Sequence, residues 1–273
     1  MNKKSMAKNI YSACATRPEE VVTCAALDAG NYPQLYSERV KSILGTIKYE
    51  GLREKVKQTL GSFEERDGED EKVLAQSSPY RLVVLQDILP KGKILVARPR
   101  LEIAKLNNPD FMYGFYVDCG LNLVGEAGYQ VNSFQAEELT KDLRQVGINL
   151  TNPKLTPYSI LTYSVDGNSP SGLVFKLSEQ GKDNAKSLIL NAGDFNWDYF
   201  PSNNGLFRAC LGRGGYWGAD DDGLRNSNDY GRVVVETTGE AMQKNFEGLQ
   251  RETTELLVRQ QKERQDLIAR LQA

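Results

Sequence analysis

The chain contains no histidine, so any catalytic or metal-binding chemistry falls to carboxylates, cysteines and glycine-rich loops. Without an imidazole it lacks Ser-His-Asp and Cys-His catalysis and the usual general base near neutral pH. Two arrangements remain for a hydrolase, Asp118 beside Cys119 and Asp194 four residues before Asp198. Such groups act together only if they converge in a pocket. Nothing in the spacing requires this, so we predict a non-enzymatic protein, with a carboxylate- or cysteine-dependent hydrolase as an alternative.

Two further stretches offer nucleotide or metal chemistry. Gly212-Arg213-Gly214-Gly215 is rich in glycine, but no helical pattern follows it to supply a phosphate-binding N-terminus. Asp220-Asp221-Asp222 carries the oxygen ligands that calcium prefers, yet it lacks the alternating spacing and closing glutamate of an EF-hand. We interpret it as a solvated acidic loop, with calcium binding as the alternative. No cofactor and no resident metal are expected.

Composition limits the partners and the compartment. The 273 residues carry a net charge of −2, which gives no electrostatic basis for binding nucleic acid or an anionic membrane. No apolar run approaches the roughly 18 residues that span a bilayer, and the basic N-terminal segment MNKKSMAKN precedes no signal-peptide core. We expect a protein made in the cytoplasm, with association with a virion or a cell surface as a further destination. The four cysteines lack metal-ligand spacing and are expected to be reduced and mostly buried: Cys14, Cys24, Cys119 and Cys210.

The elements that position these residues begin with a helical pattern over residues 1–60. A capping-box sequence, TRPE, predicts a helix that ends at Gly30, and apolar spacing predicts a second helix from about Ser37 that continues past Gly51. The acidic segment 61–78, which opens GSFEERDGEDEK, is almost free of apolar side chains in that stretch. It is therefore predicted to be a solvated linker between two regions.

From residue 79 the pattern changes to short β-branched and aromatic runs separated by Pro, Gly, Asn and Asp. One helix interrupts them, from Ser133 to Gly147. Helices before and within an antiparallel set of strands predict an α+β domain over 79–239. A C-terminal helix is expected over 240–273, where a broken apolar stripe leaves open both homo-oligomerisation through the terminal helices and packing on its own domain. The expected strands are 81–85, 93–103, 111–124, 158–165, 171–178, 186–192, 206–211 and 231–235.

Residues 191–235 have an unusual composition. They contain no Lys, Glu, Gln or Met, although these four types make up about a quarter of the rest of the chain. Gly, Asn, Asp, Ser, Arg, Tyr, Phe and Trp remain, which are the residues that antibody paratopes favour for contact area and adaptable hydrogen bonds. Loops on a rigid β scaffold are the usual place for recognition. The composition therefore favours a binding surface.

The pattern GLFRACL…GYWGADDDGLRNSNDYGRVVV resembles the C-terminal variable region of target proteins of diversity-generating retroelements, which have a C-type lectin-like fold. In that family, mutagenesis directed at adenines diversifies Asn-type codons, which reach Asn, Asp, Ser, Gly, Tyr and Arg but not Lys, Glu, Gln or Met. The resemblance implies a C-type lectin-like ligand-binding domain at 79–239 with its variable region at 191–235. It also implies an unidentified protein or surface ligand as the partner.

On this hypothesis the side chains of 191–235 divide into contacts and framework. Trp217 fits either role. The alternative to this binding hypothesis is a phage or cell-surface assembly protein with a glycine-rich contact loop. The framework residues are Phe207, Leu211, Leu224, Val233 and Val235. The expected ligand contacts are Tyr199, Phe200, Asn203, Asn204, Arg208, Arg213, Tyr216, Trp217, Asp220, Asp221, Asp222, Arg225, Asn226, Asn228 and Tyr230.

Overall fold

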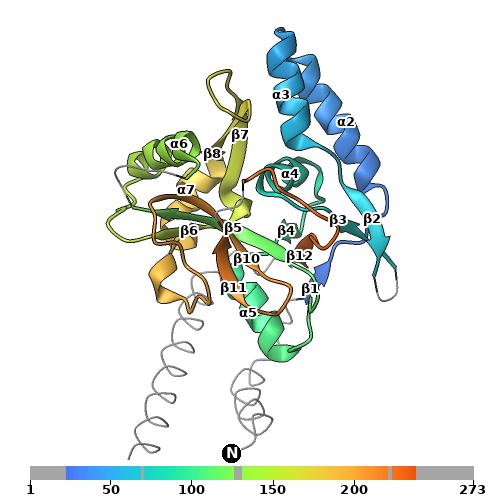
Figure 1. Cartoon of the computed structure of the whole chain (residues 1–273), viewed down its shortest axis with the longest axis vertical. Coiled ribbons are helices and arrows are strands. Elements are labelled where there is room, and N and C mark those ends of the chain that lie inside the picture. Colours follow the sequence, from blue (N-terminus) through green and yellow to red (C-terminus); the bar gives the residue numbers. More distant parts are fainter. Residues whose placement is uncertain (1–22, 69–70, 126–130, 221–222, 238–273) are drawn as a thin grey trace, which may run out of the picture.

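The computed structural model describes residues 23–68, 71–125, 131–220 and 223–237, and in this part of the chain helices and antiparallel sheets are mixed (Figure 1). The α+β class expected from the sequence is confirmed. The C-terminal helix expected at 240–273 lies outside the described residues. None of the described helices is long and apolar enough to cross a bilayer.

A five-stranded antiparallel sheet carries the glycine-rich segment, in the order β11-β10-β5-β6-β9. Its central strands are β5 (Val117–Val124) and β10 (Gly205–Leu211), and every residue of both is buried. Both faces of these strands are covered, and the polar side chains that they carry, Asp118, Asn122 and Arg208, are buried with the apolar ones. The outer strands are β6 (Lys154–Thr156), β9 (Leu190–Asn191) and β11 (Trp217–Asp220).

A second sheet joins the two ends of the described chain. Its strands are β1 (Thr23–Ala26), β12 (Val234–Thr237) and β4 (Lys93–Leu95), with Thr23 opposite Thr237. The helix predicted to run to Gly30 is therefore wrong over 23–26. Pairing with β12 gives these backbone groups partners that override the local helical pattern.

The N-terminal helices belong to the same core as the rest of the described chain. The single helix expected past Gly51 is instead two, α2 (Tyr32–Gly45) and α3 (Glu50–Leu60), which pack side by side (Figure 1). Tyr36 donates a hydrogen bond from its hydroxyl to the Leu60 carbonyl oxygen at 3.0 Å. Buried side chains from both helices share one cluster with the sheet residues. These helices are not a separate region.

The predicted linker over 61–78 is also wrong. It forms the hairpin of β2 (Glu64–Asp67) and β3 (Lys72–Ala75). The Leu74 amide donates to the Leu27 carbonyl at 2.8 Å, and the Leu74 carbonyl accepts from Val233 at 3.1 Å. The acidic side chains alternate toward solvent along β2, so their charge marks an exposed face of a strand rather than an unstructured segment.

Two expected strands are helices. α4 (Pro79–Leu85) is buried at every position, and α5 (Arg98–Asn107) replaces most of the strand expected over 93–103. A short run that is apolar throughout does not distinguish a buried helix from a buried strand. Both helices carry proline in their first turn, where its missing N–H costs nothing. Residues 111–114 form turns and Tyr116 forms an isolated β-bridge with Gly231, so only the second half of the strand expected over 111–124 is present.

The other expectations for this half of the chain hold in part. The helix predicted from Ser133 is α6 (Ser133–Gln145), which packs on β8 and β10, and the hairpin of β7 (Leu161–Val165) and β8 (Leu173–Leu177) is present. The segment expected as a strand over 186–192 is the end of α7 (Glu179–Leu188) followed by β9. Short 3₁₀ turns lie at Gln86–Ile88, Tyr158–Ile160 and Ala192–Asp194.

Three described cysteines are free thiols. Cys119 and Cys210 are buried and Cys24 is half-buried, whereas Cys14 lies outside the described residues. Burial raises the pKa of Cys24 to about 12, with Glu236 adding to the shift. The expectation of reduced, mostly buried cysteines is confirmed for these three.

Candidate functional site

In the turn between β10 and β11, the ring of the exposed Tyr216 packs on Gly212. Gly212 donates its amide to the Tyr216 carbonyl at 2.7 Å, and the Tyr216 ring lies directly over the Gly212 Cα. A Cβ at Gly212 would come within 2.3 Å of Cζ of that ring. The ring can therefore occupy this position only because residue 212 has no side chain.

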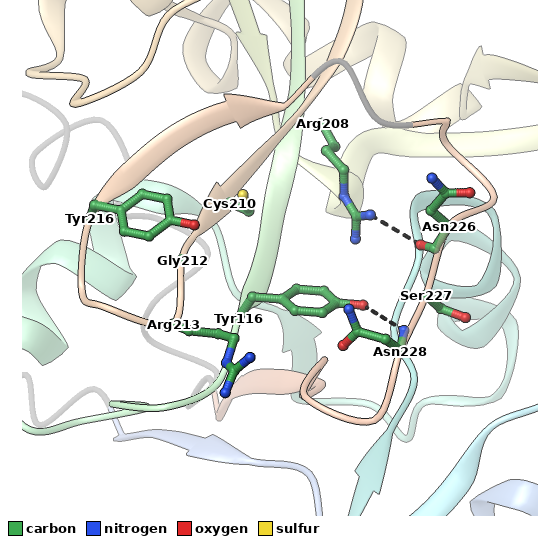
Figure 2. Close-up of a pocket in the computed structure, with 9 residues that line it drawn as sticks. All are labelled: Tyr116, Arg208, Cys210, Gly212, Arg213, Tyr216, Asn226, Ser227 and Asn228. Atoms are coloured by element: carbon green, nitrogen blue, oxygen red, sulfur yellow. Dashed lines mark hydrogen bonds between the residues drawn. The ribbon is translucent and has the colours of Figure 1, made fainter.

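An open pocket of about 370 Å³ lies beside this turn (Figure 2). Tyr216 forms one side of it, residues 226–228 form the opposite side, and Tyr116 and Arg208 lie between them. The two sides thus come from separate parts of residues 191–235, and Tyr116 comes from a different part of the chain. The complete lining is Tyr116, Arg208, Cys210, Gly212, Arg213, Tyr216, Asn226, Ser227 and Asn228.

A buried ion pair forms the base of this pocket. Arg208 donates from Nε to Asp118 Oδ1 at 2.8 Å and from Nη2 to Oδ2 at 2.7 Å. A third bond runs from Arg208 Nη1 to the Asn226 carbonyl oxygen at 3.0 Å and ties the base to the loop on one side of the pocket. Asp118 also accepts from the Ser77 hydroxyl at 3.0 Å. With both side chains almost fully buried, this two-bond pairing fixes the position of the guanidinium.

A β-bulge brings the two charges together. β5 and β10 pair in register up to Ala209 opposite Gly120, and the next pair is Cys210 opposite Asp118, so Cys119 is an extra residue. Because side chains alternate between faces, the extra residue moves Asp118 to the face that carries Arg208. In an unbulged ladder the carboxylate would point to the opposite face of the sheet.

The charges of this pair change the pKa values around them. Burial alone would lower the pKa of Arg208, but Asp118, with further contributions from Tyr116 and Tyr158, raises it overall. Burial, followed by the Asp118 carboxylate, raises the pKa of Tyr116. The arginine is therefore charged and the tyrosine neutral throughout the range in which the protein would function.

The loop beyond the pocket is anchored to Tyr116. The Tyr116 hydroxyl accepts from the Asn228 amide at 3.2 Å and donates to the Ser77 carbonyl at 3.0 Å, while the Tyr116 amide donates to the Tyr230 carbonyl at 3.1 Å. A Cβ at Gly231 would lie 2.5 Å from the Tyr116 hydroxyl oxygen, so the loop approaches the ring at a glycine. The segment 226–231 is thus held by a residue outside 191–235.

Trp217 belongs to the framework on the other face of the sheet. The buried Arg98 guanidinium lies 4.6 Å from the Trp217 ring centroid, 3.8 Å from that of Trp197 and 4.5 Å from that of Phe195. Arg98 also pairs with Glu102 at 2.8 Å. Three aromatic faces around one buried cation hold β11 and the segment before β10 in place.

The structure brings only some of the predicted contact residues together. Tyr230 adjoins the pocket, with its ring under the Arg213 guanidinium at 3.5 Å. Tyr199, Asn203 and Arg225 are exposed but do not line the pocket, and Asn204 packs near Gly125. Phe200 packs against Trp197 and the core, and the Asp220 side chain, Asp221 and Asp222 lie outside the description. Those that line the pocket are Arg208, Arg213, Tyr216, Asn226 and Asn228.

Four lining residues were missed by sequence reasoning: Tyr116, Cys210, Gly212 and Ser227. Tyr116 lies in FMYGFYVD, where four aromatic residues surround a glycine in a stretch that was predicted to be a strand. The aromatic density was a usable signal, but no local pattern links it to a loop more than a hundred positions later. The predicted framework side chains are all buried: Phe207, Leu211, Leu224, Val233 and Val235.

Asp118 and Cys119, one of the two candidate catalytic pairs, make separate contacts. Asp118 is bound to Arg208, whereas the Cys119 thiol donates to the Ala209 carbonyl at 3.3 Å in the core, where burial raises its pKa well above the usual range. Asp198 accepts from the Trp217 amide at 2.7 Å, which is a structural bond. Within the described ranges, no three acidic or cysteine side chains come close enough to hold a metal ion.

No protein-family model, curated protein or solved structure matches this chain. Its function is therefore argued from the geometry of the pocket and its framework.

Proposed function

We propose that the chain is a non-enzymatic binding protein that displays a variable surface of the diversity-generating-retroelement type. The observation that carries the proposal is that Tyr216 and Asn228, twelve positions apart, line one open pocket over a buried ion pair. A protein that changes its specificity by substitution needs exchangeable side chains on a backbone that does not move. This arrangement meets both needs.

The exposed side chains suit recognition. Tyr216 is 51% exposed and Arg213 and Asn228 are exposed, so each can contact a partner without unfolding the chain. Tyrosine supplies contact area at low entropy cost, and asparagine and serine supply adaptable hydrogen bonds. The pairing of Asp118 with Arg208 favours binding over hydrolysis, because a carboxylate held by three hydrogen bonds is poorly placed to act as a base.

The C-type lectin-like fold is the finer part of this proposal. It is supported by an antiparallel sheet that carries the variable segment on β10 and β11, and by the pairing of β1 with β12, which joins the ends of the described chain (Figure 1). Fold alone would not decide the function, which rests on the pocket.

The proposal is tested by substituting side chains that line the pocket while the framework residues are left unchanged. The combined variant Y216S/N226D/N228S changes only exposed side chains, so its Tm is expected to stay within about 2 °C of the parent. The control F207A truncates a fully buried ring and is expected to lose about 3–5 kcal/mol. Broad unfolding of the combined variant would contradict the proposal.

Binding itself is assayed by selecting from a displayed library of random 12-residue peptides on the immobilised full chain. The parent and the combined variant are expected to enrich different peptides. Identical peptides from both, or no enrichment from either, would refute a specificity surface at this pocket. Independently, the DNA around the gene is expected to hold a near-copy of the codons for 191–235 that differs mainly at adenines, beside a reverse transcriptase gene.

A further inference from the structure

Three residues of the pocket lining carry guanidinium or amide N–H donors: Arg208, Arg213 and Asn228. A guanidinium has five N–H groups, and the bonds to Asp118 and Asn226 occupy three of those on Arg208. The Arg213 guanidinium stacks on the Tyr230 ring and bonds the Gly114 carbonyl through Nε at 3.2 Å. Stacking leaves the outer edge of that guanidinium with N–H groups in its plane for a further partner.

Asn228 adds a donor of the same kind. Its Oδ1 accepts from the Tyr230 amide at 2.9 Å, which leaves the Nδ2 amide group as the part available to a ligand. The Asp118 carboxylate, the acceptor nearest the base, is occupied by three bonds from Arg208 and Ser77. A ligand group that accepts hydrogen bonds therefore finds N–H partners in this pocket.

The charge of the described side chains also favours an acceptor group. The Arg208–Asp118 pair is neutral as a unit, so Arg213 gives the lining a net positive charge. Lys105 adds a second cation at the rim, with Nζ 3.7 Å from a Cβ built on Gly215. Asp229, an exposed acid next to Asn228 in the chain, is paired with Arg66 at 3.0 Å.

We propose that this pocket receives an aspartate or glutamate side chain of a protein partner, with Arg213 as its ion-pairing residue. The inference rests on the proposed binding function and names the class of ligand. Arg213 supplies the planar fork that matches a carboxylate, and Arg208 and Asn228 supply further N–H groups.

The partner is a protein rather than a free small acid because of the surface around the pocket. A volume of about 370 Å³ is at the lower end for a small-molecule site and is open to solvent, so a single side chain occupies it while its backbone stays outside. Tyr113, at 66% exposure, and Tyr230, at 44%, provide aromatic contact area beyond the rim. The amide after Tyr113 is bound to the Arg213 carbonyl at 2.8 Å, which holds that tyrosine beside the pocket.

The test uses the peptide selection with three arginine variants of the full chain. Peptides selected on the parent are expected to be enriched in Asp and Glu relative to the unselected library. R213Q is expected to weaken binding of those acidic peptides about tenfold, since a charge-assisted bond is lost, and R213K is expected to weaken it less. R225Q is the matched control, because Arg225 is an exposed arginine of the same segment outside the pocket lining, and it is expected to leave binding within about twofold.

The outcomes separate this inference from the proposed function. Selected peptides without acidic enrichment, or equal losses from R213Q and R225Q, would overturn the carboxylate site and leave a binding surface standing. If no peptide is selected on any variant, both the carboxylate site and the proposed binding function are contradicted. Glutarate serves as the free small-acid probe, with glutaramide as its neutral match. If glutarate displaced the acidic peptides at concentrations near the peptide Kd, the occupant would be a small molecule and the inference of a protein partner would be wrong.

Discussion

Removing the charge of Asp118 tests whether the base of the pocket is held by its ion pair. Asp118→Asn keeps the size of the side chain but removes the partner of Arg208, whose guanidinium is 4% exposed. An uncompensated buried charge costs far more than a lost neutral hydrogen bond, because the guanidinium cannot lose its proton to escape the penalty. We expect Asp118→Asn to lower the free energy of unfolding by about 3–5 kcal/mol.

The assay is urea unfolding of the full chain at pH 7, with the midpoint and the m-value compared between variants. Asp229→Asn is the matched control, since Asp229 is an exposed carboxylate that also pairs with an arginine, and its midpoint is expected to change little. The double variant Asp118→Asn with Arg208→Met, which has no buried charge, is expected to be more stable than Asp118→Asn alone. A loss below about 1 kcal/mol for Asp118→Asn would refute the argument, because it would mean that the guanidinium is solvated rather than fixed by its partner.

Two further predictions concern the turn and the far side of the molecule. Gly212→Ala is expected to displace the exposed Tyr216 ring from the turn, which alters ligand selection but changes stability by no more than about 0.5 kcal/mol. Gly214→Ala is the control, because a Cβ at Gly214 would lie 3.4 Å from the Tyr216 ring. Equal effects of the two substitutions on peptide selection would contradict this view of the turn. Hydrogen bonding by Lys141 lowers the pKa of Glu138, so Glu138 stabilises the fold above its unfolded-state pKa and that stability is lost as the pH falls through the folded-state pKa. Glu138→Gln is therefore expected to be less stable than the parent at pH 7 and equal to it at strongly acidic pH, and a difference between their urea midpoints that does not change with pH would contradict this.

Much of the framework was predictable because burial leaves a local signal. The patterns of β10, β8 and the second half of β5 gave correct strands, and the apolar stripe gave α6, although its N-cap is Asn132 rather than the predicted Ser133. The same signal failed over 81–85, because this stretch belongs to a short helix that is buried at every position. It also failed over 61–78, where acidic composition hid a hairpin whose backbone pairs with distant strands.

The site was predictable only in part. The composition of 191–235 predicted a contact segment, and five of the expected side chains line the pocket. Phe200 shows the limit of composition, because an aromatic residue serves a ligand surface and a core equally well, and here it packs on Trp197. Which exchangeable residues face one another could not be derived from their types.

By itself the sequence determined the α+β class, the buried central strands and the location of an unusual binding composition, since each of these depends on residues close together in the chain. Only the tertiary structure decided that Tyr116 joins the pocket and that 23–26 pairs with β12. It also decided that a one-residue bulge turns Asp118 toward Arg208, ninety positions away. Register and long-range pairing follow from the packing of the whole chain, and a shift of a single residue reverses which face each side chain occupies.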